Sequence, residues 1–197
     1  MALAQPRYTP EEYLALERKA EYKSEYLHGL IFAMAGASRR HNLVAGNLFR
    51  EISLQLRGRS CEAYIADMRV KVSATGLYTY PDVAALCGEP RFDDTHMDTL
   101  VNPAIIVEVL SDSTEAYDRG EKFAHYRRLV SLKDYVLIAQ ERVRVEHYVR
   151  QADQWVLSEI SEPSDLLHLA SLGCDVAVSD IYDKVDFPPE PTGFRNP

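Results

Sequence analysis

The chain has 197 residues, of which 46% are hydrophobic, and this composition suits one globular domain with a full-sized core. Its formal charge of -8 argues against a protein that coats nucleic acid through its overall field, although a local basic patch beside an acidic site stays open. No run of about 18 apolar residues occurs, and the N-terminus lacks a signal-peptide pattern, so we expect a cytoplasmic protein without membrane contact.

The first half of the chain predicts a helix, a hairpin and a long helix. The stretch TPEE at residues 9–12 is a helix start with a capping box, so a helix is expected over residues 10–19. Residues 24–36 indicate two short strands with a turn near Gly29. Hydrophobic side chains at helical spacing predict a long helix over residues 38–58.

The second half predicts strands around one further helix. Residues 63–72, 80–87 and 104–110 are strand-like and should lie side by side in one sheet. A helix is expected over residues 112–131, and three later strands include a hairpin with its turn at residues 151–154. This order of elements predicts an α/β fold in which a central mixed β-sheet is flanked by α-helices.

The sequence also predicts the extent of the domain and the state of the cysteines. A single domain should cover residues 1–186, and the proline-rich residues 187–197 should form a loose tail. Cys61, Cys87 and Cys174 are far apart and form no CxxC or paired Cys/His motif. This spacing argues against zinc and against a disulfide framework, so we expect three reduced thiols.

Two carboxylates stand in apolar strands of this predicted sheet. Glu108 interrupts the run AIIVEVL, where an ionised group costs several kcal/mol unless something pairs with it. Asp82 begins the strand DVAAL, directly after Pro81. If the two strands are neighbours, the carboxylates converge and repel each other unless a cation lies between them. A hard divalent ion such as Mg²⁺ prefers such oxygen ligands and activates water for hydrolysis.

Lys122 is the candidate cationic partner. In the predicted helix it points the same way as Asp118 and Tyr126, so its ammonium could reach the carboxylates and stabilise a developing phosphate charge. The alternative is a surface ion pair with Asp118, worth a few tenths of a kcal/mol. Spacing alone favours the ion pair.

Several segments together carry a family resemblance. The stretches SEYLHGLIFAMAGAS, YPDVAAL, NPAIIVEVLSDSTEAYDRGEKFAHYRRLVSLKDYVLI and SDIYDKV resemble the Uma-type endonucleases of the PD-(D/E)XK restriction-endonuclease-like superfamily, over residues 9–185. The resemblance implies a restriction-endonuclease-like fold with Mg²⁺ or Mn²⁺ at the edge of the sheet. It assigns Asp82, Glu108 and the carbonyl of Val109 as metal ligands.

The third catalytic position departs from the superfamily pattern. A lysine is expected two residues after Glu108, and Leu110 stands there instead. In Uma-type proteins the lysine comes from the following helix, which matches Lys122, so the resemblance favours a catalytic role for it.

The resemblance also covers Glu25 and His41. Glu25 would support a metal-bound water, with a solvent-facing edge residue as the equal alternative. His41 would bind a site carboxylate or phosphate, although a lone histidine on a helix is more often structural. Beside it, Arg39 and Arg40 are candidates for contact with the nucleic-acid backbone, or simply form a solvated helix start.

These residues lead to a metal-dependent DNA endonuclease as the main hypothesis, in which a metal-activated water attacks the phosphodiester. The alternative is a catalytically inactive module of the same fold that binds nucleic acid or protein, which the acidic charge and the displaced lysine favour. A metal-dependent hydrolase acting on another substrate is the third reading. Because homodimers are common among soluble proteins, we expect a homodimer.

Overall fold

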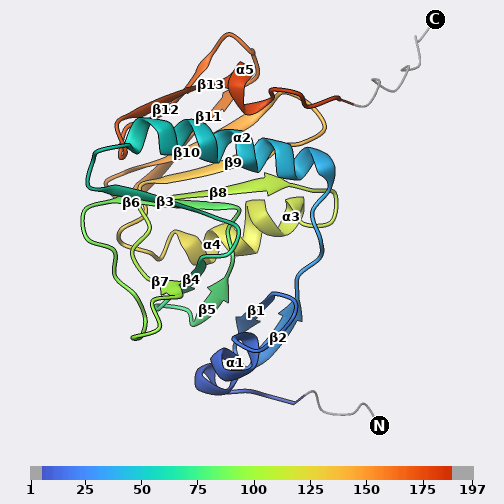
Figure 1. Cartoon of the computed structure of the whole chain (residues 1–197), viewed down its shortest axis with the longest axis vertical. Helices are drawn as coiled ribbons and strands as arrows, with labels where there is room; N and C mark the ends of the chain where they lie inside the picture. Colours follow the sequence, from blue (N-terminus) through green and yellow to red (C-terminus); the bar gives the residue numbers. More distant parts are fainter. Residues whose placement is uncertain (1–5, 188–197) are drawn as a thin grey trace, which may run out of the picture.

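The computed structural model describes residues 6–187 and is built around a six-stranded sheet (Figure 1). In spatial order its strands are β11 (Gln154–Ile160), β10 (Val145–Gln151), β9 (Asp134–Ala139), β8 (Ile105–Leu110), β6 (Val83–Cys87) and β3 (Cys61–Ile65). Strands β8 and β9 run parallel, whereas β8 and β6 are antiparallel, so the sheet is mixed.

Helices and a small hairpin cover the two faces of this sheet (Figure 1). One face carries α2 (Arg39–Leu56), the hairpin of β12 (Leu166–Leu169) and β13 (Cys174–Ala177), and α5 (Val178–Ile181). The other face carries α3 (Glu115–Tyr117) and α4 (Phe123–Tyr126). The predicted mixed sheet flanked by helices is confirmed.

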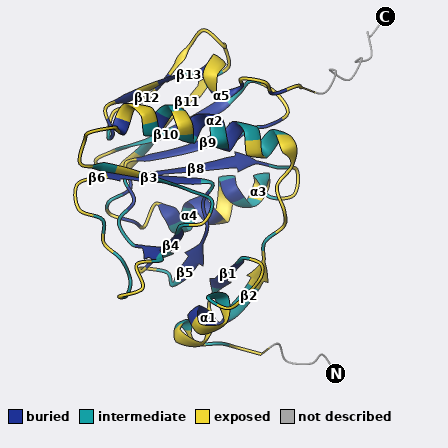
Figure 2. Ribbon diagram, in the orientation of Figure 1, coloured by how far each residue is buried: buried dark blue, intermediate teal, exposed yellow. Residues whose placement is uncertain are grey.

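Strand β8 lies in the centre because both of its faces are apolar. Ile105 and Val107 pack into the core beneath α2, whereas Ile106 and Leu110 pack into the core on the α4 side. All six residues of β8 are buried, and Figure 2 shows buried residues along this strand. Glu108 is one of these six, so its carboxylate lies inside the protein.

A second sheet carries the N-terminal part of the chain. In order, its strands are β2 (Leu30–Ala33), β1 (Ser24–Leu27), β5 (Leu77–Thr79), β4 (Arg69–Val72) and β7 (Thr99–Leu100). Helix α1 (Pro10–Glu17) begins with the predicted capping box between Thr9 and Glu12. The rings of Tyr13 and Tyr26 stack with centroids 5.0 Å apart and join α1 to β1.

Two predicted elements differ from the structure. Residues 63–72 form β3 and β4, which belong to different sheets, because the chain turns at Ala66, where φ is 54°. The helix expected over residues 112–131 is shorter and is interrupted by a π-helical turn at Asp118–Lys122. Strands β5, β7, β12 and β13 and helix α5 were not predicted, because each has at most four residues and little periodicity.

The predicted tail falls mostly outside the described residues. Residues 188–197 belong to that part, whereas Phe187 packs against the ring of Tyr182 at 5.5 Å between centroids. Within residues 6–187, no helix has both the length and the apolar character that a membrane crossing needs.

The expectation of three reduced thiols is wrong for two of them. The antiparallel register of β3 and β6 places Cys61 opposite Cys87, and the two form a disulfide. Cys174 is free and buried. A disulfide needs close Cα atoms, and here the pairing of two strands supplies a proximity that spacing along the chain did not reveal.

Replacing Cys87 by serine is expected to lower the free energy of unfolding by about 3 kcal/mol, because an open chain gains the entropy that the cross-link removes. The cysteines are 26 residues apart, which sets the size of this estimate. Urea denaturation without reductant measures the effect. Reductant should destabilise the wild type by a similar amount and leave the variant unchanged; a wild type insensitive to reductant would contradict the cross-link.

Candidate active site

Asp82 and Glu108 come together because β6 begins beside the last residues of β8. Val83 pairs with Val107 in antiparallel register, which places Asp82 next to Glu108. The Oδ2 atom of Asp82 accepts a hydrogen bond of 2.7 Å from the backbone N–H of Val109. The two strands therefore bring both carboxylates to one place, as their positions in the sequence predict.

The second oxygen of Asp82 contacts His41. Ser38 caps α2 by accepting a hydrogen bond from the His41 backbone N–H, which sets the ring in the first turn of the helix. The Nε2 atom of His41 lies 2.7 Å from Oδ1 of Asp82, and both side chains are less than one-fifth exposed. With both oxygens engaged, the carboxylate of Asp82 has a defined orientation.

Glu108 is a buried carboxylate whose Oε1 atom accepts a hydrogen bond and forms an ion pair. The hydroxyl of Tyr126 donates one over 2.7 Å, and the ammonium of Lys122 lies 2.9 Å away. Burial raises the pKa of Glu108 to about 8, because desolvation disfavours the charged form. Lys122 opposes this shift, whereas the negative charges of Asp118 and Asp82 add to it.

Lys122 is buried among three carboxylates. Its Nζ atom lies 2.9 Å from Glu108, 3.4 Å from Glu25 and 3.4 Å from Asp118. Burial by itself would lower the pKa of this ammonium, but the three negative charges outweigh burial and raise it well above its usual value. The ion pair with Asp118 that spacing favoured does form, but its predicted surface position is wrong, because both side chains are buried in the carboxylate cluster.

Glu25 reaches the same cluster from the second sheet. It lies on β1, and its side chain accepts hydrogen bonds from the hydroxyls of Thr79 on β5 and Tyr117 on α3. Its contact with Lys122 ties the N-terminal part of the chain to the carboxylates of the central sheet. Of the two sequence interpretations, the solvent-facing edge residue does not hold, because Glu25 points into the cluster.

The two arginines before His41 are engaged with acidic residues. Arg39 lies 3.2 Å from Asp186, and Arg40 lies 2.8 Å from Glu141. Both residues lie at the start of α2, and their contact with nucleic acid stays a prediction.

The donor set of the cluster fits a hard divalent cation. Asp82 and Glu108 offer carboxylate oxygens, and the backbone of Val109 reaches Asp82 through its N–H. No three His, Cys, Asp or Glu side chains form a complete metal cage within residues 6–187. Mg²⁺ typically takes one or two carboxylates and keeps several waters, so this pair is sufficient. A cation would also relieve the repulsion between Asp82 and Glu108, which adds to the effect of burial on the pKa of Glu108.

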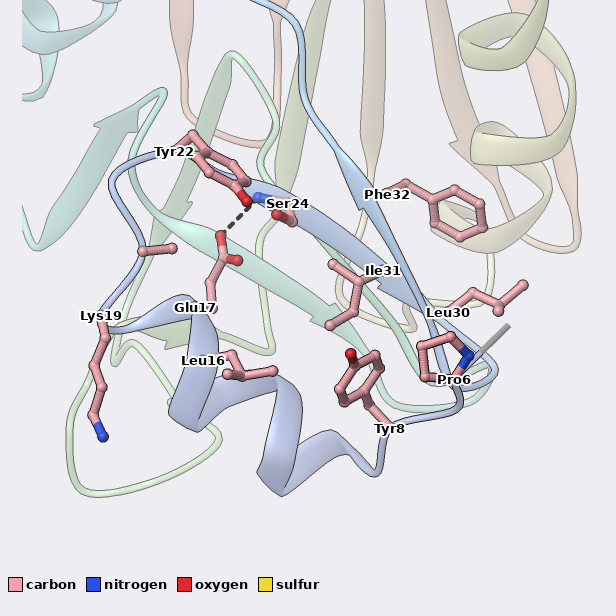
Figure 3. Close-up of a pocket in the computed structure, with 11 residues that line it drawn as sticks. Pro6, Tyr8, Leu16, Glu17, Lys19, Tyr22, Ser24, Leu30, Ile31 and Phe32 are labelled. Carbon is pink, nitrogen blue, oxygen red and sulfur yellow. Dashed lines mark hydrogen bonds between the residues drawn. The ribbon is translucent and has the colours of Figure 1, made fainter. Parts of the chain in front are cut away.

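A pocket of about 670 Å³ opens elsewhere, between α1 and the β1–β2 hairpin (Figure 3). Its lining is largely apolar, with Leu16, Ile31 and Phe32 among the side chains drawn, and Glu17 accepts a hydrogen bond from the backbone of Ser24. None of the residues predicted for the site lines it. The carboxylate cluster, and not this pocket, therefore holds the groups that can perform chemistry.

Four side chains of the cluster were absent from the predicted site. Asp118 and Tyr126 lie four residues before and after Lys122, and this spacing is the signal that could have included them. Thr79 and Tyr117 carry no comparable signal, because they meet Glu25 only through the packing of the second sheet against α3.

Relatives of the chain share most of its length. A protein of Synechocystis sp. (strain ATCC 27184 / PCC 6803 / Kazusa), "Uncharacterized protein sll1609", is 41% identical over 153 residues, which cover 77% of this chain and 86% of that protein. A second protein of the same organism, "Uncharacterized protein slr1290", is 38% identical over 183 residues, covering 92% and 95%.

A solved structure and a family model complete the comparison. The crystal structure of "a putative nuclease belonging to DUF820" from Anabaena variabilis ATCC 29413 has a TM-score of 0.72 and 19% identity, and covers 89% of this chain and 98% of that one. This likeness shows the fold, which is restriction-endonuclease-like. The family model Uma2, described as "Putative restriction endonuclease", matches residues 10–179 and supports a nuclease function. The chain therefore belongs to the Uma2 family.

Proposed function

We propose that this protein is a metal-dependent endonuclease that hydrolyses phosphodiester bonds in DNA. The observation that carries the proposal is the buried carboxylate of Glu108, which lies next to Asp82 and 2.9 Å from the ammonium of Lys122. A charged group in a central strand costs desolvation free energy, and such groups cluster at functional sites. A cation bound by this carboxylate would offset that cost. Membership of the Uma2 family supports the same reaction class.

The cation would be held by oxygen atoms of three residues. Asp82, Glu108 and the carbonyl of Val109 would bind Mg²⁺ or Mn²⁺, which supplies Lewis acidity toward a water and the scissile phosphate. His41 and the Val109 N–H keep Asp82 in one orientation for this purpose.

The remaining residues act on the substrate. The Lys122 ammonium donates a hydrogen bond to a phosphate oxygen as negative charge develops on it. Glu25 accepts a hydrogen bond from the attacking water and orients it toward phosphorus. A bond forms between the water oxygen and phosphorus while the bond from phosphorus to one deoxyribose oxygen breaks; the water gives up a proton to the solvent, and the leaving oxygen takes up a proton from the solvent.

A plasmid-nicking assay tests the proposal. The wild type should convert supercoiled DNA to nicked or linear DNA with Mg²⁺ or Mn²⁺, and EDTA or Asp82→Asn should stop the reaction. If supercoiled, linear and single-stranded DNA all stay intact while the protein still binds them in a salt-dependent manner, the chain is a binding module and not a nuclease.

His41→Asn should lower kcat about 10- to 100-fold, because Asp82 loses the partner of one carboxylate oxygen. The nicking rate at saturating Mn²⁺ measures this. His168 offers a matched control, since it lies 2.8 Å from Asp175 on the solvent-facing side of the β12–β13 hairpin. His168→Asn should cleave at the wild-type rate. If both variants lost the same fraction of the nicking rate, His41 would have no specific role in the site.

A further inference from the structure

Asp118 is a buried carboxylate that the proposed function leaves without a role. It is 3% exposed, and its Oδ1 atom lies 3.4 Å from the Nζ atom of Lys122. An ammonium has three N–H donors, and Lys122 has three carboxylates around it, those of Glu108, Glu25 and Asp118. Glu25 and Asp118 are not among the proposed metal ligands. They can therefore keep Lys122 in place when Glu108 binds the cation.

The π-helical turn places Asp118 for this contact. In a regular α-helix, side chains at positions i, i+4 and i+8 drift by roughly 40° at each step, because four residues exceed one turn of 3.6. Asp118, Lys122 and Tyr126 stand at this spacing, and the wider turn over Asp118–Lys122 rotates less per residue. The three side chains therefore stay aligned toward β8, where Lys122 and Tyr126 both contact Glu108.

The backbone of Asp118 is anchored as well. Its carbonyl accepts a hydrogen bond of 2.9 Å from the hydroxyl of Tyr135 on β9, and its N–H donates to the carbonyl of Thr114 over 2.8 Å. Tyr135 is fully buried in the sheet. The side chain of Asp118 thus projects from a fixed point, which a positioning group requires.

We propose that Asp118 is a positioning residue whose carboxylate, together with that of Glu25, holds the Lys122 ammonium at the site independently of Glu108. Its part in catalysis rests on the proposed nuclease function, whereas the hold on Lys122 does not. Asp118 itself touches neither the cation nor the phosphate. Its loss should therefore change the rate and not the binding of metal or DNA.

The hold on Lys122 is measured without any substrate. In ¹H–¹⁵N spectra recorded for ammonium groups, the Lys122 signal, identified by its loss in Lys122→Arg, should be visible through slow exchange with water. It should persist in Glu108→Gln, where Glu25 and Asp118 remain, and vanish in the double variant Glu108→Gln/Asp118→Asn, where only Glu25 remains. The matched control is Asp93→Asn, which removes the partner of Lys71 at 2.7 Å and should leave the Lys122 signal unchanged. A wild type without this signal, or a Glu108→Gln/Asp118→Asn variant that retains it, overturns the inference.

The cleavage assay tests the functional part. Asp118→Asn should lower kcat roughly 10- to 100-fold, with the KM for DNA and the Kd for Mn²⁺, measured by calorimetry with the metal alone, within about threefold of wild type. A Kd raised more than tenfold would make Asp118 a metal ligand and overturn its positioning role. If the wild type cleaves nothing but the ammonium spectra behave as expected, the proposed function fails while the hold on Lys122 stands. If the wild type cleaves and Asp118→Asn matches its rate, the proposed function stands and the positioning role of Asp118 in catalysis is overturned.

Discussion

Replacing Glu108 by glutamine is expected to reduce metal-dependent DNA cleavage by about a thousandfold. The substitution keeps the size of the side chain and can keep its hydrogen bond with Tyr126, but it removes the negative charge that a cation requires. Single-turnover nicking of supercoiled plasmid with Mn²⁺ measures the loss.

The fold should tolerate this change. Glu108 carries a desolvation cost that a neutral amide avoids, and Lys122 retains Glu25 and Asp118 as partners. Glu62→Gln, on the exposed part of β3 in the same sheet, is the matched control and should cleave normally. A Glu108→Gln variant that stays folded and cleaves within tenfold of wild type would exclude Glu108 as a metal ligand.

Lys122→Met is expected to cause the largest loss of stability, about 3–5 kcal/mol, because it leaves three carboxylates without their shared cation. For a chain of this size, that loss corresponds to a fall in Tm of roughly 10 °C. Thermal unfolding followed by circular dichroism measures it. Cleavage, assayed well below the new Tm, should fall as well, since the phosphate loses its hydrogen-bond donor.

The matched control is Lys133→Met, because Lys133 is exposed at the start of β9. Its Tm should stay within about 2 °C of wild type, as for most surface substitutions. A similarly small shift for Lys122→Met would mean that water, and not the ammonium, compensates the carboxylates. That result would contradict the stabilisation of the three carboxylates by the Lys122 ammonium.

Local patterns in the sequence were sufficient for the central strands and the two carboxylates. The run around Glu108 is apolar on both faces, and only a strand in the middle of a sheet satisfies such a run. The capping box of α1 and the helical spacing of apolar residues in α2 are local patterns, because they involve residues that are close in the sequence. Those helices were therefore also predictable. The shared helix face of Asp118, Lys122 and Tyr126 made Lys122 a candidate, and the family resemblance, with Leu110 at the usual lysine position, favoured a catalytic role for it.

What the sequence alone determined was therefore the presence of Asp82 and Glu108 on strands of one sheet and of Lys122 on the helix after it. Tertiary structure decided that Glu25 joins them from a second sheet, and that Cys61 lies opposite Cys87. It also decided that a π-helical turn directs Asp118 and Lys122 inward. The physical reason is that strand register and helix phase are set by the packing of segments distant in the chain, which periodicity within one segment does not encode.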